Sequence, residues 1–203
     1  MKKLFFLVFC LAILLSSGLA YAEYDGDLQL NAGYAHLSVS RDDRNVDDSE
    51  SSENFALGFS NHNLWSISDL FSVGFMEKLD FSFGDLSGDE DDFCFEIGVL
   101  CGPSVGFNPT QNISIILGAG FVVGGAAFSG EEDSSVDWVG FGGGTDLQVK
   151  FLASKFVSPI IGFSWLHFSS DEITLTISEH SYDFAVDTTT NVFRAYAGVS
   201  LNF

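Results

Sequence analysis

A histidine and a serine stand two residues apart in His167-Phe168-Ser169, a spacing that could support chemistry. Residues two apart on a strand share a face, and a histidine that activates a serine can drive ester hydrolysis when a carboxylate orients it. Glu172 and Glu179 follow closely enough to be that carboxylate. Three residue types do not specify an active site, so we expect no enzyme and no catalytic residue, with a hydrolase as an alternative.

Metal-binding patterns are weaker. The four histidines have no ligand spacing, and no HExxH motif occurs. Acidic runs such as Asp42-Asp43 and Asp89-Glu-Asp-Asp92 could hold calcium or magnesium loosely, but they lack EF-hand spacing. We therefore expect no metal site and no cofactor.

Cys94 and Cys101 are seven residues apart in one apolar segment. On an extended strand they would be about 23 Å apart. A disulfide needs a Cα separation of roughly 4.4–6.8 Å. The spacing predicts two thiols on opposite faces of one strand.

The composition combines a high apolar content with a strong negative charge. Of 203 residues, 46% are hydrophobic. The chain has 28 Asp and Glu residues and only 8 Lys and Arg residues, for a net charge of −20. This sign of charge excludes nucleic acid as a partner. Beyond the N-terminus the apolar residues are interrupted too often for a membrane helix. Such interruption is typical of transmembrane barrels, whose strands alternate lipid-facing and lumen-facing residues.

The N-terminus has the three parts of a secretory signal peptide. Met1-Lys2-Lys3 is basic, an apolar run covers 4–15, and Ala20-Tyr21-Ala22 offers a cleavage site. The apolar run is shorter than the roughly 20 residues of a membrane-spanning helix. We predict a signal peptide at 1–22 and a single barrel domain at 23–203.

Alternating segments predict an all-β fold, a single eight-stranded antiparallel up-and-down transmembrane β-barrel. The predicted strands are 27–40, 54–61, 71–84, 93–107, 113–128, 138–151, 158–168 and 191–203.

The connections between these strands sort by charge. Those at 41–53, 85–92, 129–137 and 169–190 carry formal charges of −4 or −5 each. Those at 62–70, 108–112 and 152–157 carry between −1 and +1. In an up-and-down barrel, alternate connections emerge on opposite sides of the membrane, with the long ones outside. The charge pattern therefore predicts long acidic extracellular loops.

Charged residues at inward-facing positions predict contacts inside the lumen. We expect Glu96 and Arg194 to form an ion pair, with Lys78 and Asp146 as further members, because buried charges persist only when they are paired. A small water-filled lumen that solvates these charges is the alternative.

Two residues fit the predicted strands poorly. Glu77 falls on the lipid-facing side of 71–84, so we expect either a bulge that turns it inward or another register. Pro103 cannot donate a ladder hydrogen bond, so a bulge or a strand end is expected near it.

The last segment alternates from Phe193 to Phe203, with an aromatic residue at the end. Together with the signal peptide and the eight segments, Gly198-Val-Ser-Leu-Asn-Phe203 resembles the small bacterial outer-membrane barrels of the OmpA/OmpX/OmpW type. The resemblance implies the bacterial outer membrane as location, with Phe203 as a signal read by the barrel assembly machinery. It also implies outer-membrane lipid and lipopolysaccharide as partners.

In the connection at 169–190, apolar and polar residues continue to alternate beyond the membrane. This pattern predicts a hairpin that turns at Glu179-His180-Ser181. Two more membrane-crossing strands are the alternative. OmpX-type barrels are thought to bind extracellular proteins by strand addition, which implies a possible extracellular protein ligand. Three functions stay open: a surface anchor or adhesin, a small passive channel, and a lipid-modifying hydrolase. For the last, His167-Phe168-Ser169 resembles the His-x-Ser arrangement of outer-membrane lipid A deacylases.

Overall fold

The computed structural model describes residues 25–43, 46–85, 93–130, 134–154, 156–177 and 180–203. The predicted signal peptide, most of the connection at 85–92 and Glu179 lie outside these ranges. Within them, no helix is long and apolar enough to cross a membrane.

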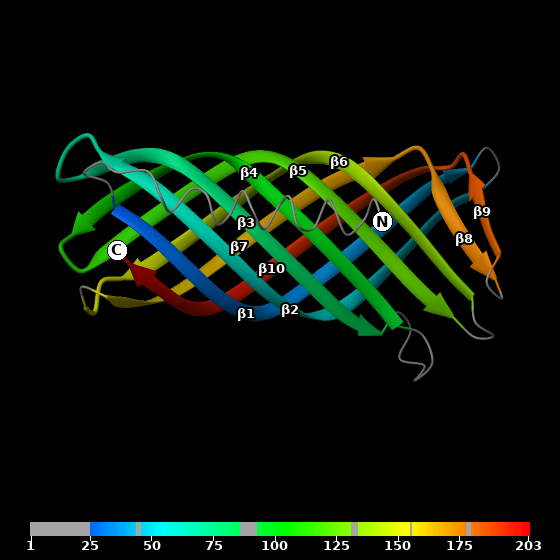
Figure 1. Ribbon diagram of the computed structural model, residues 1–203, viewed down its shortest axis with the longest axis horizontal. Helices are drawn as coiled ribbons and strands as arrows, with labels where there is room; N and C mark the ends of the chain where they lie inside the picture. The colour runs from blue at the N-terminus through cyan, green and yellow to red at the C-terminus, as the bar shows by residue number, and fades with distance from the viewer. Residues whose placement is uncertain (1–24, 44–45, 86–92, 131–133, 155, 178–179) are drawn as a thin grey trace.

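The described residues form ten strands (Figure 1). Their bounds are β1 Asp25–Asp43, β2 Val46–Ser66, β3 Phe71–Asp85, β4 Phe93–Thr110, β5 Ile113–Gly130, β6 Ser134–Phe151, β7 Val157–Ser170, β8 Ile173–Ile177, β9 His180–Phe184 and β10 Asp187–Asn202. Eight of them pair antiparallel with sequence neighbours into a closed ring, in which β10 follows β7 and pairs with β1. The eight-stranded antiparallel barrel predicted from the alternation is confirmed.

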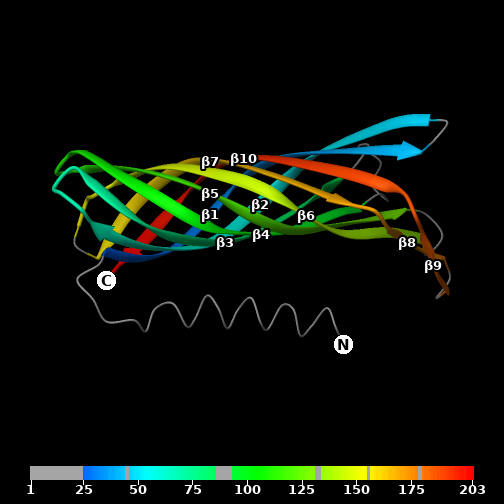
Figure 2. The same cartoon turned by 90° about the horizontal axis from the view of Figure 1, so that it is seen from above.

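The two remaining strands form a hairpin, as predicted, but His180 and Ser181, which were expected in its turn, belong to β9 and pair with Ile177 and Thr176. β8 pairs with β9, and it also pairs with the first residues of β6, from Ser134 to Asp137. Figure 2 shows this hairpin and the ends of β1 and β2 at the same end of the barrel, on opposite sides. The alternative of ten membrane-crossing strands is wrong, because β8 and β9 have five residues each.

The barrel is apolar outside, and many of the side chains inside it are polar. On β1, Leu28 and Leu30 are 46% and 49% exposed, whereas Gln29 and Asn31 between them are 1% and 4% exposed. A soluble barrel would have the opposite arrangement, since it buries apolar side chains and exposes polar ones. This outer surface fits the hydrocarbon core of a bilayer.

Several strands extend beyond the predicted bounds. β2 begins at Val46 instead of 54, and β1 continues to Asp43, so most of the connection expected at 41–53 is strand. Most of the connection expected at 129–137 is also strand. The hydrophobic alternation ends where strands leave lipid, but the backbone ladder continues, which is why these connections were predicted too long.

The expectations for Glu77 and Pro103 are both wrong. β3 pairs with β2 and β4 in one continuous register, so Glu77 keeps its outward position opposite Asn61, whose amide nitrogen lies 3.5 Å from the Glu77 carboxylate. β4 passes Pro103 in unchanged register with β5, and its register shifts only between Phe107 and Thr110. An amide on the neighbouring strand accommodates the acid without a bulge.

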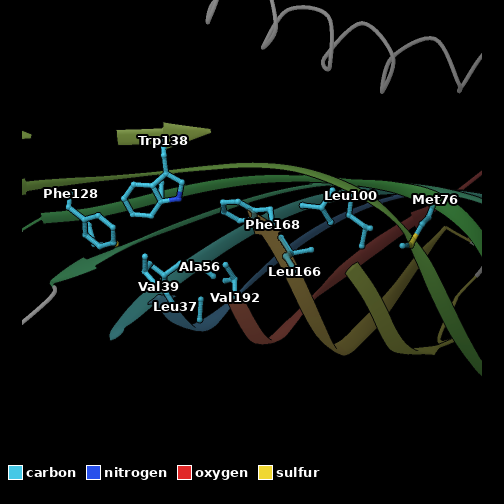
Figure 3. Packing of buried hydrophobic residues seen from close by; sticks show 14 residues of the cluster. Leu37, Val39, Ala56, Met76, Leu100, Phe128, Trp138, Leu166, Phe168 and Val192 are labelled. Carbon is cyan, nitrogen blue, oxygen red and sulfur yellow. The ribbon is translucent and has the colours of Figure 1, made fainter. Parts of the chain in front are cut away.

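The lumen towards the hairpin end is filled by apolar side chains (Figure 3). Phe168 lies over Gly124, where an added Cβ would stand 2.5 Å from its ring. Leu37, Leu166 and Trp138 are also buried in this cluster. Glycine on one wall therefore makes room for a large side chain from the other, and the interior is packed.

Candidate functional site

The predicted lumen residues come from four strands: Lys78 lies on β3, Glu96 on β4, Asp146 on β6 and Arg194 on β10. Asp80, also on β3, lies among them. Each is at most 2% exposed. Strand alternation turns these side chains inward, and the narrow eight-stranded ring brings them within contact.

Arg194 contacts two carboxylates from the opposite wall. Its Nη2 donates to Oε2 of Glu96, and its Nη1 lies 2.5 Å from Oδ2 of Asp80. The structure thus places the predicted partners Glu96 and Arg194 together and adds Asp80. The side chain of Arg194 is held between β3 and β4.

Lys78 and Asp146 are also in contact. The hydroxyl of Tyr196 donates to both oxygens of Asp146, at 2.9 and 3.0 Å, and Lys78 Nζ lies 4.0 Å from the centroid of the Tyr196 ring. Lys78 Nζ is 3.7 Å from Asp80 Oδ2, which joins the two pairs. We call Lys78, Asp80, Glu96, Asp146 and Arg194 the lumen charge cluster.

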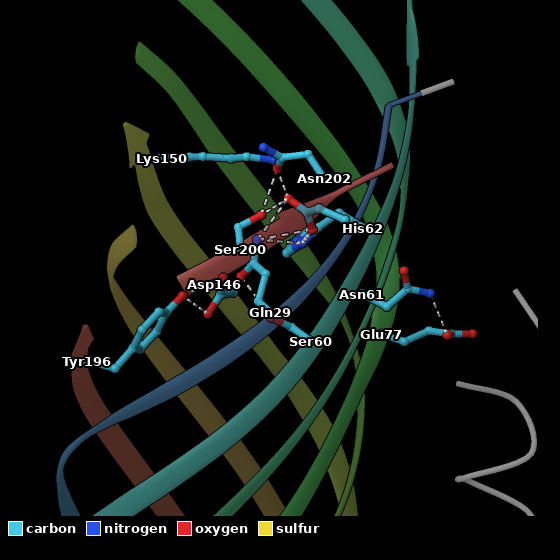
Figure 4. A network of polar contacts seen from close by, with 11 residues as sticks. Gln29, Ser60, Asn61, His62, Glu77, Asp146, Lys150, Tyr196, Ser200 and Asn202 are labelled. Atoms are coloured by element: carbon cyan, nitrogen blue, oxygen red, sulfur yellow. Dashed lines mark hydrogen bonds and ion pairs between the residues drawn. The ribbon is translucent and has the colours of Figure 1, made fainter. Parts of the chain in front are cut away.

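A second polar network lies nearer the end where Phe203 stands (Figure 4). Asp27 accepts from Lys150 at 2.6 Å and from Ser200 at 3.0 Å, and it lies 3.1 Å from both His62 Nδ1 and Gln29 Nε2. Sequence reasoning did not single out Asp27 or His62. The alternation could have indicated Asp27, because it shares the inward face of β1 with Gln29. His62 was expected in the connection at 62–70 and not in a strand.

A cavity of 480 Å³ opens at this end of the barrel. Asp27 and Lys150 line it together with Ser72, Ser114 and Asn202. The lumen charge cluster and the apolar cluster occupy the interior beyond it. The cavity, which we call the cup, is thus open at this end and bounded on its inner side by the side chains of these two clusters.

Phe203 lies at the rim of this cup, 63% exposed. Its backbone exchanges two hydrogen bonds with Gly26, at 3.0 and 3.2 Å, which continues the β1–β10 pairing to the last residue. Its role as an assembly signal remains a prediction.

The remaining candidates lie outside the lumen charge cluster. His167 Nδ1 contacts Asn191 Oδ1 at 2.9 Å, so its described partner is an amide instead of a carboxylate or Ser169. Cys94 faces the lumen near Ser52, 3.6 Å away, and it is not bridged to Cys101. Among the described residues, no group of histidine, cysteine or acidic side chains could hold a metal ion.

Comparison with known proteins identifies the fold. No protein-family model and no curated protein sequence matches the chain. The Neisserial surface protein A is 18% identical with a TM-score of 0.52, and the match covers 88% of this chain and 97% of that one. OprG of Pseudomonas aeruginosa is 11% identical with a TM-score of 0.53, covering 88% and 96%.

The outer membrane protease OmpT of Escherichia coli has the same TM-score of 0.53 at 5% identity, covering 90% of this chain and 99% of that one. These identities are too low to carry a function, since one scaffold serves many. The closed ring, the apolar outer surface and these likenesses agree: the chain has the fold of the small bacterial outer-membrane β-barrel proteins.

Proposed function

We propose that the protein is an integral outer-membrane barrel that acts at the cell surface as an anchor or adhesin, binding a cationic protein segment. One observation carries this proposal. The ends of β1 and β2 and the β8–β9 hairpin extend from the same end of a barrel whose interior is filled by side chains. The membrane part supplies a rigid base, and the extensions supply the contact surface.

The blocked interior supports a surface role over transport. Arg194, Lys78 and Phe168 are buried within the lumen, beyond the cup at the Phe203 end. An eight-stranded barrel is narrow enough for side chains to fill it completely. The passive channel is therefore the less favoured function, and we expect no steady conductance in a planar bilayer.

The β8–β9 hairpin offers a strand edge. Within the described residues, β9 is the last strand of the sheet order, and all its side chains are exposed. An exposed edge presents backbone groups to which an extended segment can add as a further strand. The hairpin is thus suited to strand addition.

Charge indicates what kind of segment would fit. Exposed acidic side chains surround the hairpin and the neighbouring strand ends, namely Asp171, Glu172, Asp183 and Asp187. Opposite charge accelerates encounter and disfavours acidic partners. The partner that fits is a basic, extended protein segment. Divalent cations that bridge these acids to anionic lipopolysaccharide would add a looser contact.

The histidine and serine of β7 do not favour a hydrolase. His167 is engaged with Asn191, and an amide cannot stabilise an imidazolium as a carboxylate does. A non-enzymatic role therefore remains our proposal.

Binding of designed peptides tests this function. We expect an alternating Lys-Val peptide to bind the barrel in detergent, with weaker binding at high salt, and an alternating Glu-Val peptide not to bind. Deletion of 172–186 should abolish binding. Asp183→Asn should weaken it, while Asp69→Asn, an equally exposed change in the turn between β2 and β3, should not. Equal affinity of the deletion variant would contradict the proposal.

A further inference from the structure

The lumen charge cluster contains an unequal number of acids and bases. Asp80, Glu96 and Asp146 face only Lys78 and Arg194, and all five are at most 2% exposed. The Asp27 network has its own cation in Lys150, at 2.6 Å. If all three acids of the cluster were ionised, one negative charge would remain uncompensated in a site closed to bulk water, which is strongly unfavourable.

The three acids differ in how their oxygens are stabilised. Both oxygens of Asp146 accept from Tyr196, and Oδ1 also contacts Lys78. Asp80 Oδ2 lies near both cations, 2.5 Å from Arg194 and 3.7 Å from Lys78. Each aspartate therefore has a cation next to one of its oxygens.

Glu96 has one stabilised oxygen and one without a partner. Oε2 accepts from Ser82 at 2.9 Å and from Arg194, whereas Oε1 has no hydrogen-bond partner in the described part of the chain. A Cβ added to Gly98 would stand 3.1 Å from Oε1 and 2.6 Å from the Leu166 Cδ1 methyl, so Oε1 faces an apolar space. An ionised oxygen is least favourable in such surroundings.

We propose that Glu96 binds a proton on Oε1 at neutral pH, so that the lumen is a proton-binding site. With this proton, the cluster contains two negative charges, on Asp80 and Asp146, and two positive charges, on Lys78 and Arg194. Arg194 then forms its ion pair with Asp80 and donates a hydrogen bond to the neutral Glu96 through Oε2. Lys78 and Asp146 form the second ion pair.

A proton fits this place better than a metal ion. Calcium takes six to eight oxygen ligands, and magnesium takes six. Among the described residues, a Cβ built on Gly98 would meet Leu166 and Oε1 but no further oxygen. A proton needs only the one oxygen. The titratable groups that interact with Glu96 are Arg194 on β10, Asp80 on β3 and Cys94 on β4 itself. Lys78 on β3, Asp146 on β6 and Tyr196 on β10 complete the surrounding network.

Infrared spectroscopy of the folded protein in detergent tests the proposal. At neutral pH the wild type should show the carbonyl stretch of a protonated carboxylic acid, shifted to lower frequency in heavy water. Glu96→Gln should lose this band. Glu53→Gln, a matched change at an exposed position, should keep it. A wild-type spectrum without the band would overturn the proposal, and so would a band that persists in Glu96→Gln.

The urea midpoint of unfolding tests the proposal independently of the infrared band. Glutamine has the shape of the neutral acid, so the urea midpoint of Glu96→Gln should stay close to that of the wild type. Asp80→Asn removes the ionised partner of Arg194 and should lower the midpoint clearly. The reverse order of the two midpoints would show that Glu96 is the ionised acid.

Discussion

Arg194 Nη1 lies 2.5 Å from Asp80 Oδ2, although β10 and β3 are separated in the ring by β1 and β2. The contact crosses the lumen instead of following the wall. Because both side chains are buried, the pair ties two distant parts of the barrel together and blocks the passage between them.

Removing the cation should be costly. Arg194→Met leaves Asp80 without its nearest positive charge, and breaking a buried pair in this way costs about 3–5 kcal/mol. Urea unfolding in detergent measures the loss. Arg41→Met is the matched control, since Arg41 is partly exposed and 3.4 Å from Glu50, and it should cost about 0–1 kcal/mol. Equal losses for the two variants would show that the buried contact is weak.

A glycine substitution can test how tightly side chains pack in the lumen towards the hairpin end. Gly124→Ala places a Cβ 2.5 Å from the Phe168 ring and should destabilise the barrel by about 1–3 kcal/mol. Gly143→Ala is the control, because its Cβ would meet only the Gly120 carbonyl oxygen, at 3.6 Å. If both variants unfold at the same urea concentration, the lumen is looser than described.

The apolar outer surface can be tested on β1. Leu30→Arg places a charge on the lipid-facing side and should lower stability by up to about 2–4 kcal/mol, the cost of an arginine at the bilayer midplane. Tyr182→Arg, on β9 above the barrel, should change stability little. Folding in lipid vesicles at increasing urea measures both variants, and a tolerated Leu30→Arg would argue against lipid contact.

The Asp27 network should depend on its lysine. Lys150→Met removes the closest cation of Asp27 and should cost about 1–3 kcal/mol, because a buried acceptor then loses a partner. Lys150→Arg keeps the charge and should cost less. The same unfolding assay compares them, and a Lys150→Met variant as stable as the wild type would mean that His62, Gln29 and Ser200 suffice for Asp27.

The membrane part of the fold could be predicted because lipid enforces strict alternation. Leu28 and Leu30 face outward while Gln29 and Asn31 face inward, in the alternation that the sequence predicts. The start of β2 at Val46 could not be predicted, because above the membrane neither face must be apolar and the alternation is lost. Backbone pairing with β1 extends the strand there, together with the contact between Arg41 and Glu50.

The candidate site was predictable only in part. Inward positions follow from alternation, so Glu96 and Arg194 could be named together. Their distances to Asp80 depend on how far the strands are staggered around the ring, which no single strand encodes. The contact of Asp27 with His62 could not be predicted for the same reason, since it depends on the register of β1 against β2.

Labelling of intact cells tests the central claim most directly, namely that a membrane barrel presents the β8–β9 hairpin outside the cell. In a Cys94→Ser, Cys101→Ser background, Ser181→Cys on β9 and Ser68→Cys in the turn between β2 and β3 are matched exposed positions. A membrane-impermeant maleimide should label Ser181→Cys on intact cells and Ser68→Cys only after the outer membrane is permeabilised. Labelling of Ser68→Cys alone on intact cells, or of neither variant before permeabilisation, would contradict the account.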